Sequence, residues 1–294
     1  MQKSSRRIVL KTLAGSALTL PVVDSLAASL EQTTQAVAPK LKGNINHSVC
    51  QWCYSKIPFE DLCKNAKEIG LQSVELTNAE HWPILKKYGL TSAIVYGGGK
   101  GIERGFNDPN LHDELVASYE ANFAKVKEAG MKNVICFSGN RRADLNDEQG
   151  LENCTKGLKR LMASAEKHGI VLVMELLNSK VNHKNYMADH TAWGVELCKR
   201  IGSENFKLLY DIYHMQIMEG DIIRTIKDSH KYIGHYHTGG NPGRAEIDET
   251  QEIYYPAVMK AIVETGYKGF VGQEFIPKRD PMTSLRQAVQ ICDV

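Results

Sequence analysis

Short apolar runs rich in β-branched residues alternate with longer amphipathic stretches from residue 44 to the end of the chain. The runs have the length and composition of buried β-strands. They lie at 45–50, 72–76, 91–95, 132–137, 170–175, 206–211, 232–237 and 269–274. The intervening stretches carry apolar residues at helical spacing, and three of them end on a Gly typical of a helix C-cap, at 59–70, 114–130 and 154–169. Eight strand–helix units in about 250 residues predict a single (β/α)8 TIM barrel.

An open, doubly wound α/β sheet would produce a similar alternation of strands and helices. That architecture commonly binds a nucleotide at a glycine-rich turn that follows a strand and opens a helix. No G-x-G-x-x-G segment has that context, and GGGKG at 97–101 departs from the P-loop pattern. The sequence also shows no repeat array, low-complexity tract or second domain. We therefore expect one catalytic barrel domain over residues 44–294.

Four polar residues end the last four predicted strands: Glu175, Asp211, His237 and Glu274. Consecutive members are about 30 residues apart, which is the length of one strand–loop–helix–loop unit. The C-terminal ends of barrel strands share one side of the molecule, where barrel enzymes carry their chemistry. Because parallel strands are buried on both faces, an acid that ends such a run requires a partner. We therefore expect the four side chains to converge.

Three carboxylates and an imidazole form a ligand set suited to one divalent ion such as Mg²⁺, Mn²⁺, Co²⁺ or Zn²⁺. A single Asp or Glu at a strand end is commonly a helix N-cap or one half of a salt bridge instead. Four such residues in register are harder to explain by capping, so we expect a metal site. Glu175 and Glu274 are also candidates for proton transfer, because carboxylates serve as general acids and bases.

Two carboxylates beside a metal-held carbonyl compound suggest two reactions. Glu175 and Glu274, on the fifth and eighth strands, would approach a bound substrate from opposite sides. Return of a proton to the same carbon gives epimerisation, whereas its return to the neighbouring carbon gives aldose–ketose isomerisation. The sequence leaves both reactions open.

Other residues near predicted strand ends are weaker candidates. Asn140 and Arg141 follow the fourth strand and would either bind substrate oxygens or cap a loop. Trp52 follows the first strand and would line a pocket or pack in the core. His183 falls in the loop after the fifth strand, where a solvated position is expected. His235 points into the barrel interior, either as a neighbour of the site or as a core residue.

The N-terminal segment has the organisation of an export signal. A basic stretch containing Arg6-Arg7 precedes the apolar segment TLAGSALTLPVV and small residues before position 28. The apolar segment is too short for an ordinary membrane span, and the paired arginines resemble a twin-arginine signal. We predict a signal peptide over 1–27, a linker over 28–43, delivery to the periplasm by the twin-arginine export machinery, and no stable membrane insertion. A disordered or amphipathic N-terminus is the alternative.

Charge and cysteine content narrow the classes of partner. The chain carries 36 Lys and Arg against 34 Asp and Glu, a net charge of +2, and the basic leader accounts for the excess. A near-neutral barrel lacks the basic surface expected for nucleic-acid binding. Seven scattered cysteines do not form a disulfide framework. Cys50 and Cys53 form C-x-x-C, and the sequence leaves open whether this pair is redox-active, disulfide-bonded or part of the packing.

Four segments of the second half together resemble the xylose-isomerase-like TIM-barrel superfamily. They are MELLNSK, LLYDIYHMQ, GHYHTGGNPGR and GQEF. Within that superfamily the likeness is to the hydroxypyruvate isomerase group and the related ketose 3-epimerases. The resemblance covers the chain from about residue 44 to its end. It therefore implies the same barrel fold as the pattern of strands and helices.

The resemblance implies one divalent metal held by four side chains: Glu175, Asp211, His237 and Glu274. It also implies that the two glutamates act as an acid/base pair on a metal-chelated keto sugar or hydroxy-keto acid. His237 stands where hydroxypyruvate isomerases usually have Gln. The epimerases have His at this position, as this chain does. This departure leaves the substrate open.

The resemblance further implies substrate-binding residues in three segments. His214 lies three residues after the strand-six Asp in DIYH, and Arg244 lies in the loop after the seventh strand. Asn178 belongs to the strand-five motif, in which Leu176 replaces the Pro that is common in the family. Together with Asn140, these residues complete the expected substrate site.

The function favoured by the resemblance is a hydroxypyruvate isomerase-like reaction through an enediolate, with ketose 3-epimerisation as the alternative. An apurinic endonuclease shares this barrel but needs a multi-zinc cluster and a basic groove for DNA, which the near-neutral charge opposes. A non-catalytic periplasmic sugar-binding protein would have lost one of the two glutamates, and both are present. The sequence is compatible with a homo-oligomer and does not define the exact substrate.

Overall fold

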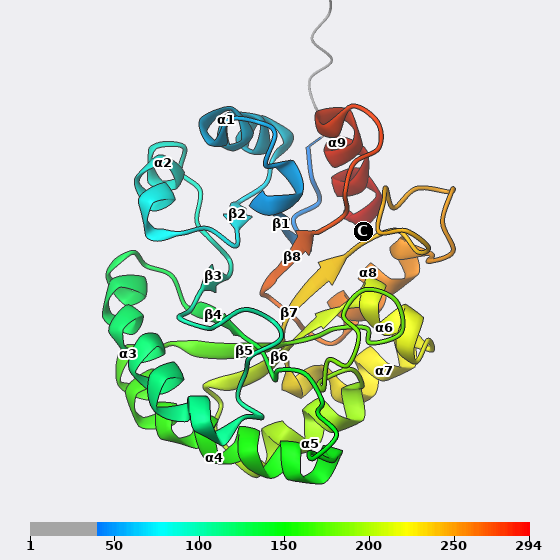
Figure 1. Ribbon diagram of the computed structural model, residues 1–294. Helices are drawn as coiled ribbons and strands as arrows, with labels where there is room; N and C mark the ends of the chain where they lie inside the picture. Colours follow the sequence, from blue (N-terminus) through cyan, green and yellow to red (C-terminus); the bar gives the residue numbers. More distant parts are fainter. Residues whose placement is uncertain (1–39) are drawn as a thin grey trace, which may run out of the picture. The chain divides into compact units, whose positions relative to one another are not determined.

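Eight parallel strands form a nearly closed barrel in the part of the chain that the computed structural model describes, residues 40–294 (Figure 1). The strands are β1 (Asn46–Cys50), β2 (Ser73–Glu75), β3 (Val95–Tyr96), β4 (Asn133–Cys136), β5 (Val171–Leu176), β6 (Phe206–Asp211), β7 (Ile233–Thr238) and β8 (Phe270–Gln273). Their hydrogen-bonded order is β2-β1-β8-β7-β6-β5-β4-β3, and short bridges between the β2 and β3 segments close the circle. The predicted single barrel is therefore confirmed.

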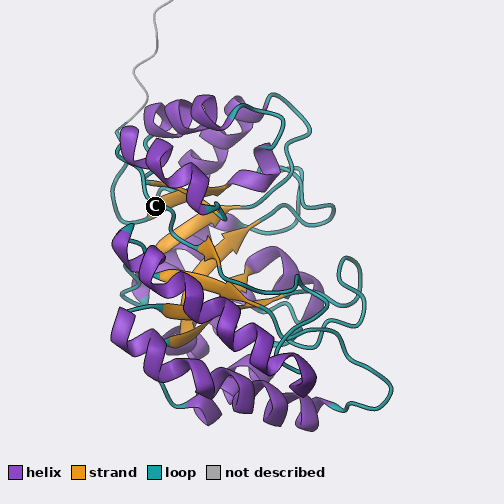
Figure 2. Ribbon diagram, turned by 60° about the vertical axis from the view of Figure 1, so that its left-hand side comes forward, coloured by secondary structure: helices purple, strands orange, loops and turns teal. Residues whose placement is uncertain are grey.

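Helices cover the outside of the barrel, and the longer loops gather at one end of it (Figure 2). The helices are α1 (Phe59–Ile69), α2 (Trp82–Lys87), α3 (His112–Glu128), α4 (Asp147–His168), α5 (Thr191–Ile201), α6 (Ile212–Met218), α7 (Ile222–Ser229), α8 (Tyr255–Glu264) and α9 (Pro281–Cys292). Short 3-10 turns lie at Gln51–Tyr54, Ala79–His81, Pro109–Leu111 and His230–Tyr232. None of the helices within residues 40–294 is long and apolar enough to cross a membrane.

Helix ends follow the local chemistry of the sequence. Gly70 and Gly169 end α1 and α4 with φ angles of +102° and +68°, the left-handed conformation that a Gly C-cap adopts without strain. The side chain of Asn146 accepts a hydrogen bond from the backbone N–H of Gln149, and the Gln149 side chain accepts one in return, so α4 starts at a capping box.

The third strand is shorter than the sequence suggested. Residues 91–95 were expected to form it, but only Val95–Tyr96 is regular strand. The Oγ of Ser73 accepts the hydrogen bond of the Ala93 N–H at 2.8 Å, and the Asn133 side chain donates to the Ala93 carbonyl at 3.0 Å. Side chains therefore replace part of the strand-to-strand ladder here.

Alternation along β5 points the functional end of the strand into the barrel. Val171 and Val173 pack in a small cluster inside the barrel, whereas Leu172 and Met174 pack in the large cluster that includes the helices. Because successive strand residues point to opposite faces, Glu175 continues the inner row above Val173. The same rule directs His235 and His237 of β7 inward.

The expected signal peptide and most of the expected linker lie outside the described residues, which begin at residue 40. The barrel wall itself begins at Asn46, where β1 starts.

Candidate metal and substrate site

The four strand-end residues converge at the end of the barrel where the strands finish. Glu175 is the fifth residue of β5, Asp211 ends β6 and His237 is the fifth residue of β7. Glu274 follows β8 directly instead of lying in the strand. All four are buried, and one ligand atom from each lies within 4.8 Å of the others. The register of β6 and β7 pairs Asp211 directly with His237.

The unpaired atoms of this group fit a divalent cation. The His237 Nδ1 lies 2.9 Å from Glu274 Oε2 and 3.6 Å from Glu175 Oε1, without the geometry of a hydrogen bond. Glu175 Oε1 and His237 Nδ1 thus have no hydrogen-bond partner among the described residues, although both are buried. Leaving such atoms unsatisfied is unfavourable, and carboxylate oxygens with an imidazole nitrogen are suitable ligands for a divalent ion.

Asp211 uses one carboxylate oxygen to cap a helix and directs the other towards the site. Its Oδ1 accepts hydrogen bonds from the backbone N–H groups of Tyr213 and His214 at 2.9 and 3.2 Å, so it caps the N-terminus of α6. Its Oδ2 faces the guanidinium of Arg244 at 3.3 Å. The cap fixes the carboxylate and leaves one oxygen for the site.

Arg244 lies across the carboxylates from the loop after β7. Its Nη2 approaches Glu274 Oε2 at 2.5 Å, and its guanidinium lies over the rings of Trp52 and Tyr213 at 5.1 and 5.6 Å. Trp52 in turn donates from its indole N–H to Glu274 Oε1 at 2.8 Å. Arg244 adopts a φ of +54°, an uncommon backbone conformation for a long side chain, and its surroundings hold it there.

The two glutamates differ in proton affinity. Burial raises the pKa of Glu175, and the nearby charge of Glu274 raises it further. Burial would also raise the pKa of Glu274, but Arg244 and His237 hold that pKa well below its usual value. Burial raises the pKa of Asp211 well above its usual value against the pull of Arg244. Environments that separate two carboxyl groups in this way are typical of acid/base pairs.

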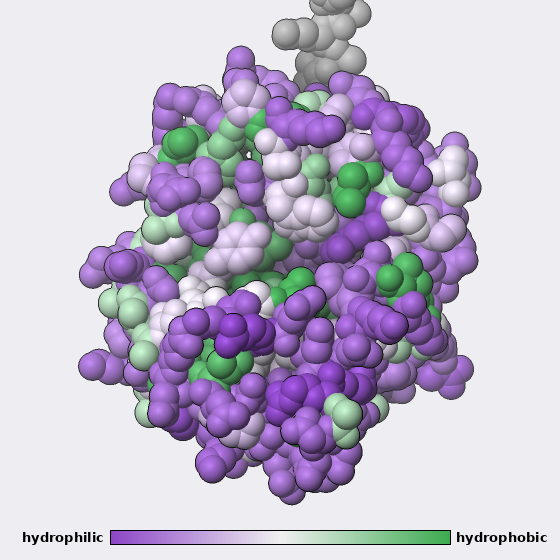
Figure 3. Space-filling model, in the orientation of Figure 1, coloured by the Kyte–Doolittle hydropathy of each residue, from purple (hydrophilic) through white to green (hydrophobic). Residues whose placement is uncertain are grey.

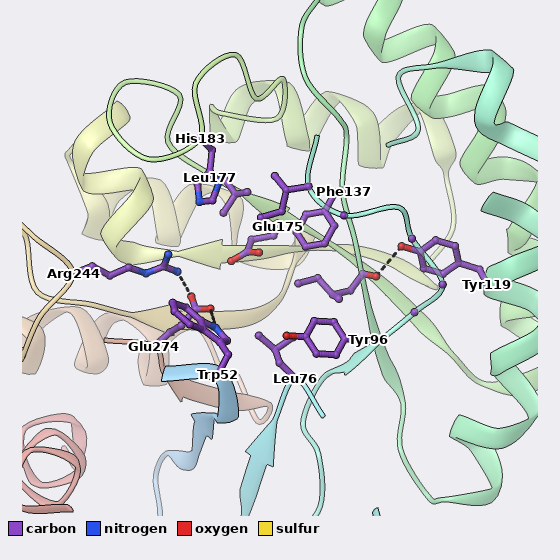
Figure 4. A pocket seen from close by; sticks show the side chains of 16 residues that line it. Trp52, Leu76, Tyr96, Tyr119, Phe137, Glu175, Leu177, His183, Arg244 and Glu274 are labelled. Atoms are coloured by element: carbon purple, nitrogen blue, oxygen red, sulfur yellow. Dashed lines mark hydrogen bonds and ion pairs between the residues drawn. The ribbon is translucent and has the colours of Figure 1, made fainter. Parts of the chain in front are cut away.

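A cavity of about 570 Å³ opens beside these side chains. Figure 3 shows the hollow on this face, and Figure 4 shows Glu175, Glu274 and Arg244 at one end of it. Its wall is formed by Trp52, Leu76, Tyr96, Gly97, Gly98, Gly99, Gly101, Ile102, Tyr119, Ile135, Phe137, Glu175, Leu177, His183, Arg244 and Glu274. A cavity of this size with a few convergent polar groups is typical of a small-molecule site.

His214 and Asn178 support the site from behind the cavity wall. Both are fully buried, and neither is part of the lining. The backbone N–H of Asn178 donates to His214 Nδ1 at 3.1 Å, which places the ring proton on Nε2, 3.5 Å from Asp211 Oδ2. Burial lowers the pKa of His214 well below its usual value, so the ring is neutral.

Comparison with known proteins shows the family. The profile described as "Xylose isomerase-like TIM barrel" matches residues 63–293, most of the chain. The chain belongs to this xylose isomerase-like TIM-barrel family. It is 30% identical over 181 residues to the hydroxypyruvate isomerase of Escherichia coli K12. The aligned region covers 60% of this chain and 68% of that protein. It is 28% identical over 130 residues to a putative human hydroxypyruvate isomerase, which covers 44% of this chain and less than half, 47%, of that protein.

Solved structures share the barrel at lower sequence identity. A family 2 AP endonuclease from Brucella melitensis superposes with a TM-score of 0.72 at 23% identity, covering 82% of this chain and 97% of that one. D-psicose 3-epimerase from Clostridium cellulolyticum H10 superposes with a TM-score of 0.69 at 17% identity, covering 85% and 100%. These likenesses establish the fold.

Three further candidates lie elsewhere than the sequence suggested: Asn140 and Arg141 lie away from the cavity, and His183 lines it. Asn140 lies in the loop after β4, bridged to Tyr186, and is not among the cavity-lining residues. Its neighbour Arg141 is held by Asp189 and Asp147 at 2.8 and 2.7 Å, so its charge is engaged away from the cavity. His183, expected in a solvated loop, instead lines the cavity and faces the ring of His214 at 5.3 Å between centroids.

Glu75, at the end of β2, is a buried partner that the sequence reasoning overlooked. Its Oε1 lies 2.7 Å from His237 Nε2 and 2.8 Å from His235 Nε2. Burial would raise the pKa of Glu75, but the two histidines hold it far below its usual value, so the carboxylate is ionised and accepts both bonds. A weaker signal was available, since the predicted strand QSVEL carries a lone acid one position before its end.

The cysteines of the described barrel are all free, including Cys50 and Cys53. The Sγ of Cys50 lies 3.6 Å from both Glu75 Oε1 and His237 Nε2. Burial raises the pKa of both thiols well above its usual value, which opposes thiolate chemistry. Of the readings that the sequence left open, the structure favours packing.

Proposed function

We propose that this chain is a divalent-metal-dependent isomerase that acts on a small hydroxy-keto acid or keto sugar through an enediolate. The observation that carries the proposal is the convergence of three carboxylates and one imidazole beside a cavity that Glu175 and Glu274 line: Glu175, Asp211, His237 and Glu274. The similarity to proteins named hydroxypyruvate isomerase supports the same reaction class. When bound by these side chains, a divalent cation would stabilise the negative charge that develops on the substrate oxygens.

Glu175 and Glu274 supply the proton transfers in this proposal. The base removes a proton from the carbon next to the carbonyl, and the electron pair moves to form the enediolate. Return of a proton to the neighbouring carbon completes isomerisation. Glu274, whose pKa is held low, is suited to act first as the base, and Glu175, whose pKa is raised, is suited to act as the acid.

Arg244 and His214 have separate roles in the proposal. Arg244 holds Asp211 and Glu274 and presents its charge to the polar end of the cavity, where it would orient a substrate carboxylate or carbonyl. His214 lies behind Asp211 and keeps its Nε2–H directed at the site. Asn178 orients His214, and Asn140 has no contact with the cavity in support of its expected role.

A ketose 3-epimerase is the second candidate. His237 occupies the third ligand position where hydroxypyruvate isomerases usually have Gln, and this residue favours the epimerase group. In epimerisation both glutamates would address one carbon from opposite faces, and proton return would invert that carbon. The two reactions therefore use the same side chains and differ in where the substrate carbon chain lies.

The cellular location is a separate proposal that rests on the sequence of residues 1–27. The Arg6-Arg7 pair and the apolar segment behind it support export by the twin-arginine machinery to the periplasm. That route carries folded proteins, which suits a protein that takes up a metal ion before export.

Exchange of substrate protons with solvent tests the proposal directly. The protein is incubated in D₂O with Mn²⁺ and either hydroxypyruvate or a ketohexose such as D-fructose, and deuterium incorporation is followed by NMR. We expect metal-dependent incorporation at the carbon next to the carbonyl, with product analysis separating isomerisation from epimerisation. Binding without exchange across a panel of such compounds would support the non-catalytic sugar-binding alternative instead.

A further inference from the structure

We propose that the apolar end of the cavity receives an uncharged ring attached to the reacting hydroxy-carbonyl unit, and that a phosphorylated substrate is not accommodated there. The ring is either a second sugar or an aryl group, which share an apolar face. This inference rests on the proposed function and adds a substrate class to it.

The cavity has two chemically different ends. Glu175, Glu274 and Arg244 from the segments of β5, β8 and β7 form the polar end. The other end is formed by residues that follow or belong to β2, β3 and β4, among them Tyr96 and Phe137 (Figure 4). A three-carbon acid held at the carboxylates would leave this second end unfilled. The substrate that fits the whole cavity therefore extends beyond its reacting carbons.

The apolar end offers no free positive charge. Arg244 is the only Lys or Arg that lines the cavity within the described chain, and it is engaged by Asp211 and Glu274 at the opposite end. Lys100, in the loop after β3, forms an ion pair with Glu114 of α3. A phosphate dianion would have to be desolvated there without a counter-charge, which is unfavourable.

The glycine-rich part of this loop also lacks the features of a phosphate cradle. Gly97, Gly98 and Gly99 do not adopt the positive φ angles of an anion-binding nest. Gly101 does, at +83°, but it is a single such residue, and α3 begins only at His112, well beyond it. A Cβ atom on Gly97 would lie 2.1 Å from the ring of Tyr119. The backbone at Gly97 therefore packs directly against α3, and this close packing leaves more space in the cavity.

The wall of the apolar end presents mainly ring and aliphatic surface. The Tyr119 hydroxyl donates to the carbonyl of Ile135 at 3.0 Å and is not available to a ligand. Tyr96 remains 43% exposed although it lines the cavity, so its ring is accessible for stacking. Leu76 is held at a φ of +56°, a strained conformation for a Leu, and forms part of this wall. Aromatic and aliphatic walls of this kind recognise the apolar face of a ring.

A binding comparison on the Mn²⁺-saturated protein tests the inference without requiring catalysis. The probes are D-glucose, phenyl β-D-glucopyranoside, cellobiose and D-glucose 6-phosphate, titrated by calorimetry. We expect at least one of the two ring-bearing probes to bind about tenfold or more tightly than glucose, because an additional ring buries apolar surface. We expect the phosphate to give no gain. The phenyl and cellobiose arms distinguish an aryl group from a second sugar.

Variants locate the gain in the cavity. Ile102→Trp narrows the apolar end, and Tyr96→Ala removes an accessible ring. In each variant the affinity for the ring-bearing probe should fall to about that for glucose, while Mn²⁺ affinity is unchanged. Ile223→Trp, on the outer helix α7, is the matched control and should retain the gain. Tighter binding of glucose 6-phosphate, no gain with either ring, or a gain that survives both cavity variants would overturn the inference. Ring preference without any proton exchange would contradict only the isomerase proposal.

Discussion

The carboxylate of Glu75 accepts a hydrogen bond from the Nε2–H of His237 at 2.7 Å, deep in the barrel and on the far side of the ring from the other three site residues. This contact fixes the ring so that Nδ1 faces the carboxylates of Glu175 and Glu274. Partners of this kind orient a metal-binding His and raise its basicity. A Cβ atom on Gly272 of β8 would lie 2.4 Å from Glu75 Oε1, so the neighbouring strand leaves room for the carboxylate only as Gly.

Glu75→Gln should therefore weaken metal binding without removing a ligand. The amide no longer provides an ionised acceptor for both histidines, and we expect the Mn²⁺ dissociation constant to rise by about 10- to 100-fold. Competition with a chelating dye measures this affinity. Glu219→Gln is a matched control, since Glu219 is half-buried and accepts a hydrogen bond from the Thr191 N–H away from the site. Unchanged affinity in Glu75→Gln would show that the contact serves packing alone.

Removal of the ion should lower the stability of the folded protein. The three carboxylates lie within one small volume, and a ligand that binds only the folded state stabilises it by about 2.7 kcal/mol at 100 times its dissociation constant. We expect EDTA to lower Tm by several degrees and Mn²⁺, Co²⁺ or Mg²⁺ to restore it, measured by differential scanning fluorimetry. A metal-free protein whose Tm responds to no divalent ion would count against the site.

The sequence was sufficient to place the four strand-end residues because their positions follow from simple periodicities. Parallel strands end on one side of a barrel, and alternation along each strand decides which residues point inward. Asp211 shows why a single position is ambiguous: it is both a helix cap and a site residue, one role for each oxygen. The convergence was visible only across several strands.

Residues whose placement depends on loop conformation could not be predicted in the same way. His183 reaches the cavity because Asn178 Oδ1 accepts hydrogen bonds from the N–H groups of Val181 and Asn182, which turn the loop back over the barrel. Arg141, next to Asn140, is drawn away by Asp189, which is 48 positions later in the chain. The contact of Arg141 with Asp189 has no local sequence signature, and the local turn at Asn178 does not by itself define where the rest of the loop lies. Glu75 was overlooked because Leu76 follows it, so the acid does not end its predicted strand as the other four residues end theirs.

The buried His47 should make stability depend on pH. Both of its ring nitrogens lack a hydrogen-bond partner among the described residues, and burial lowers its pKa from 6.5 to about 4, against a weak opposing effect of Asp293. Because the folded pKa is the lower one, the unfolded chain binds the proton first as pH falls. The free energy of unfolding is therefore unaffected by the titration of His47 above pH 6.5 and falls by about 3 kcal/mol as the pH is lowered from 6.5 to 4.

Urea unfolding of wild type and His47→Gln between pH 7 and 4 measures this contribution. At pH 7 the variant should be no more stable than wild type. Towards pH 4 its free energy of unfolding should fall less steeply than that of wild type. The exposed His230 provides a control, since His230→Gln should retain the wild-type slope. Equal slopes for His47→Gln and wild type would show that His47 does not govern the acid response.

Export should depend on the paired arginines of the leader. Replacement of Arg6-Arg7 by Lys-Lys preserves charge but should leave the precursor in the cytoplasm, because the twin-arginine route reads the pair itself. Cell fractionation and immunoblotting follow the processed and unprocessed forms. Lys11→Arg is a charge-preserving control outside the pair and should be exported normally. Normal export of the Lys-Lys variant would point to the general secretory route.

The decisive test of the mechanism separates metal binding from proton transfer. Asp211→Asn replaces an anionic ligand by a neutral amide, so it should lose activity mainly by losing the ion, and excess Mn²⁺ should recover part of that activity. His214→Ala should weaken substrate binding and leave the ion bound, since the Nε2–H of His214 has no hydrogen-bond partner among the described residues and is not one of the four ligand atoms. Metal affinity and substrate KM are measured for both variants.

Glu274→Gln and Glu175→Gln should abolish proton transfer even when Mn²⁺ is saturating. An amide cannot serve as a general base, and loss of such a group lowers the rate by about 100- to 10,000-fold. In Glu274→Gln the Trp52 indole N–H can still donate to the oxygen of the new amide, so the side chain keeps its place and the loss is chemical. Because the two glutamates occupy different strands, the variants should differ in which substrate proton still exchanges with D₂O. If Glu274→Gln turned over normally with saturating metal and a confirmed substrate, the two-glutamate mechanism would be wrong. The barrel and the metal site would survive that result, but the proposed isomerase chemistry would not.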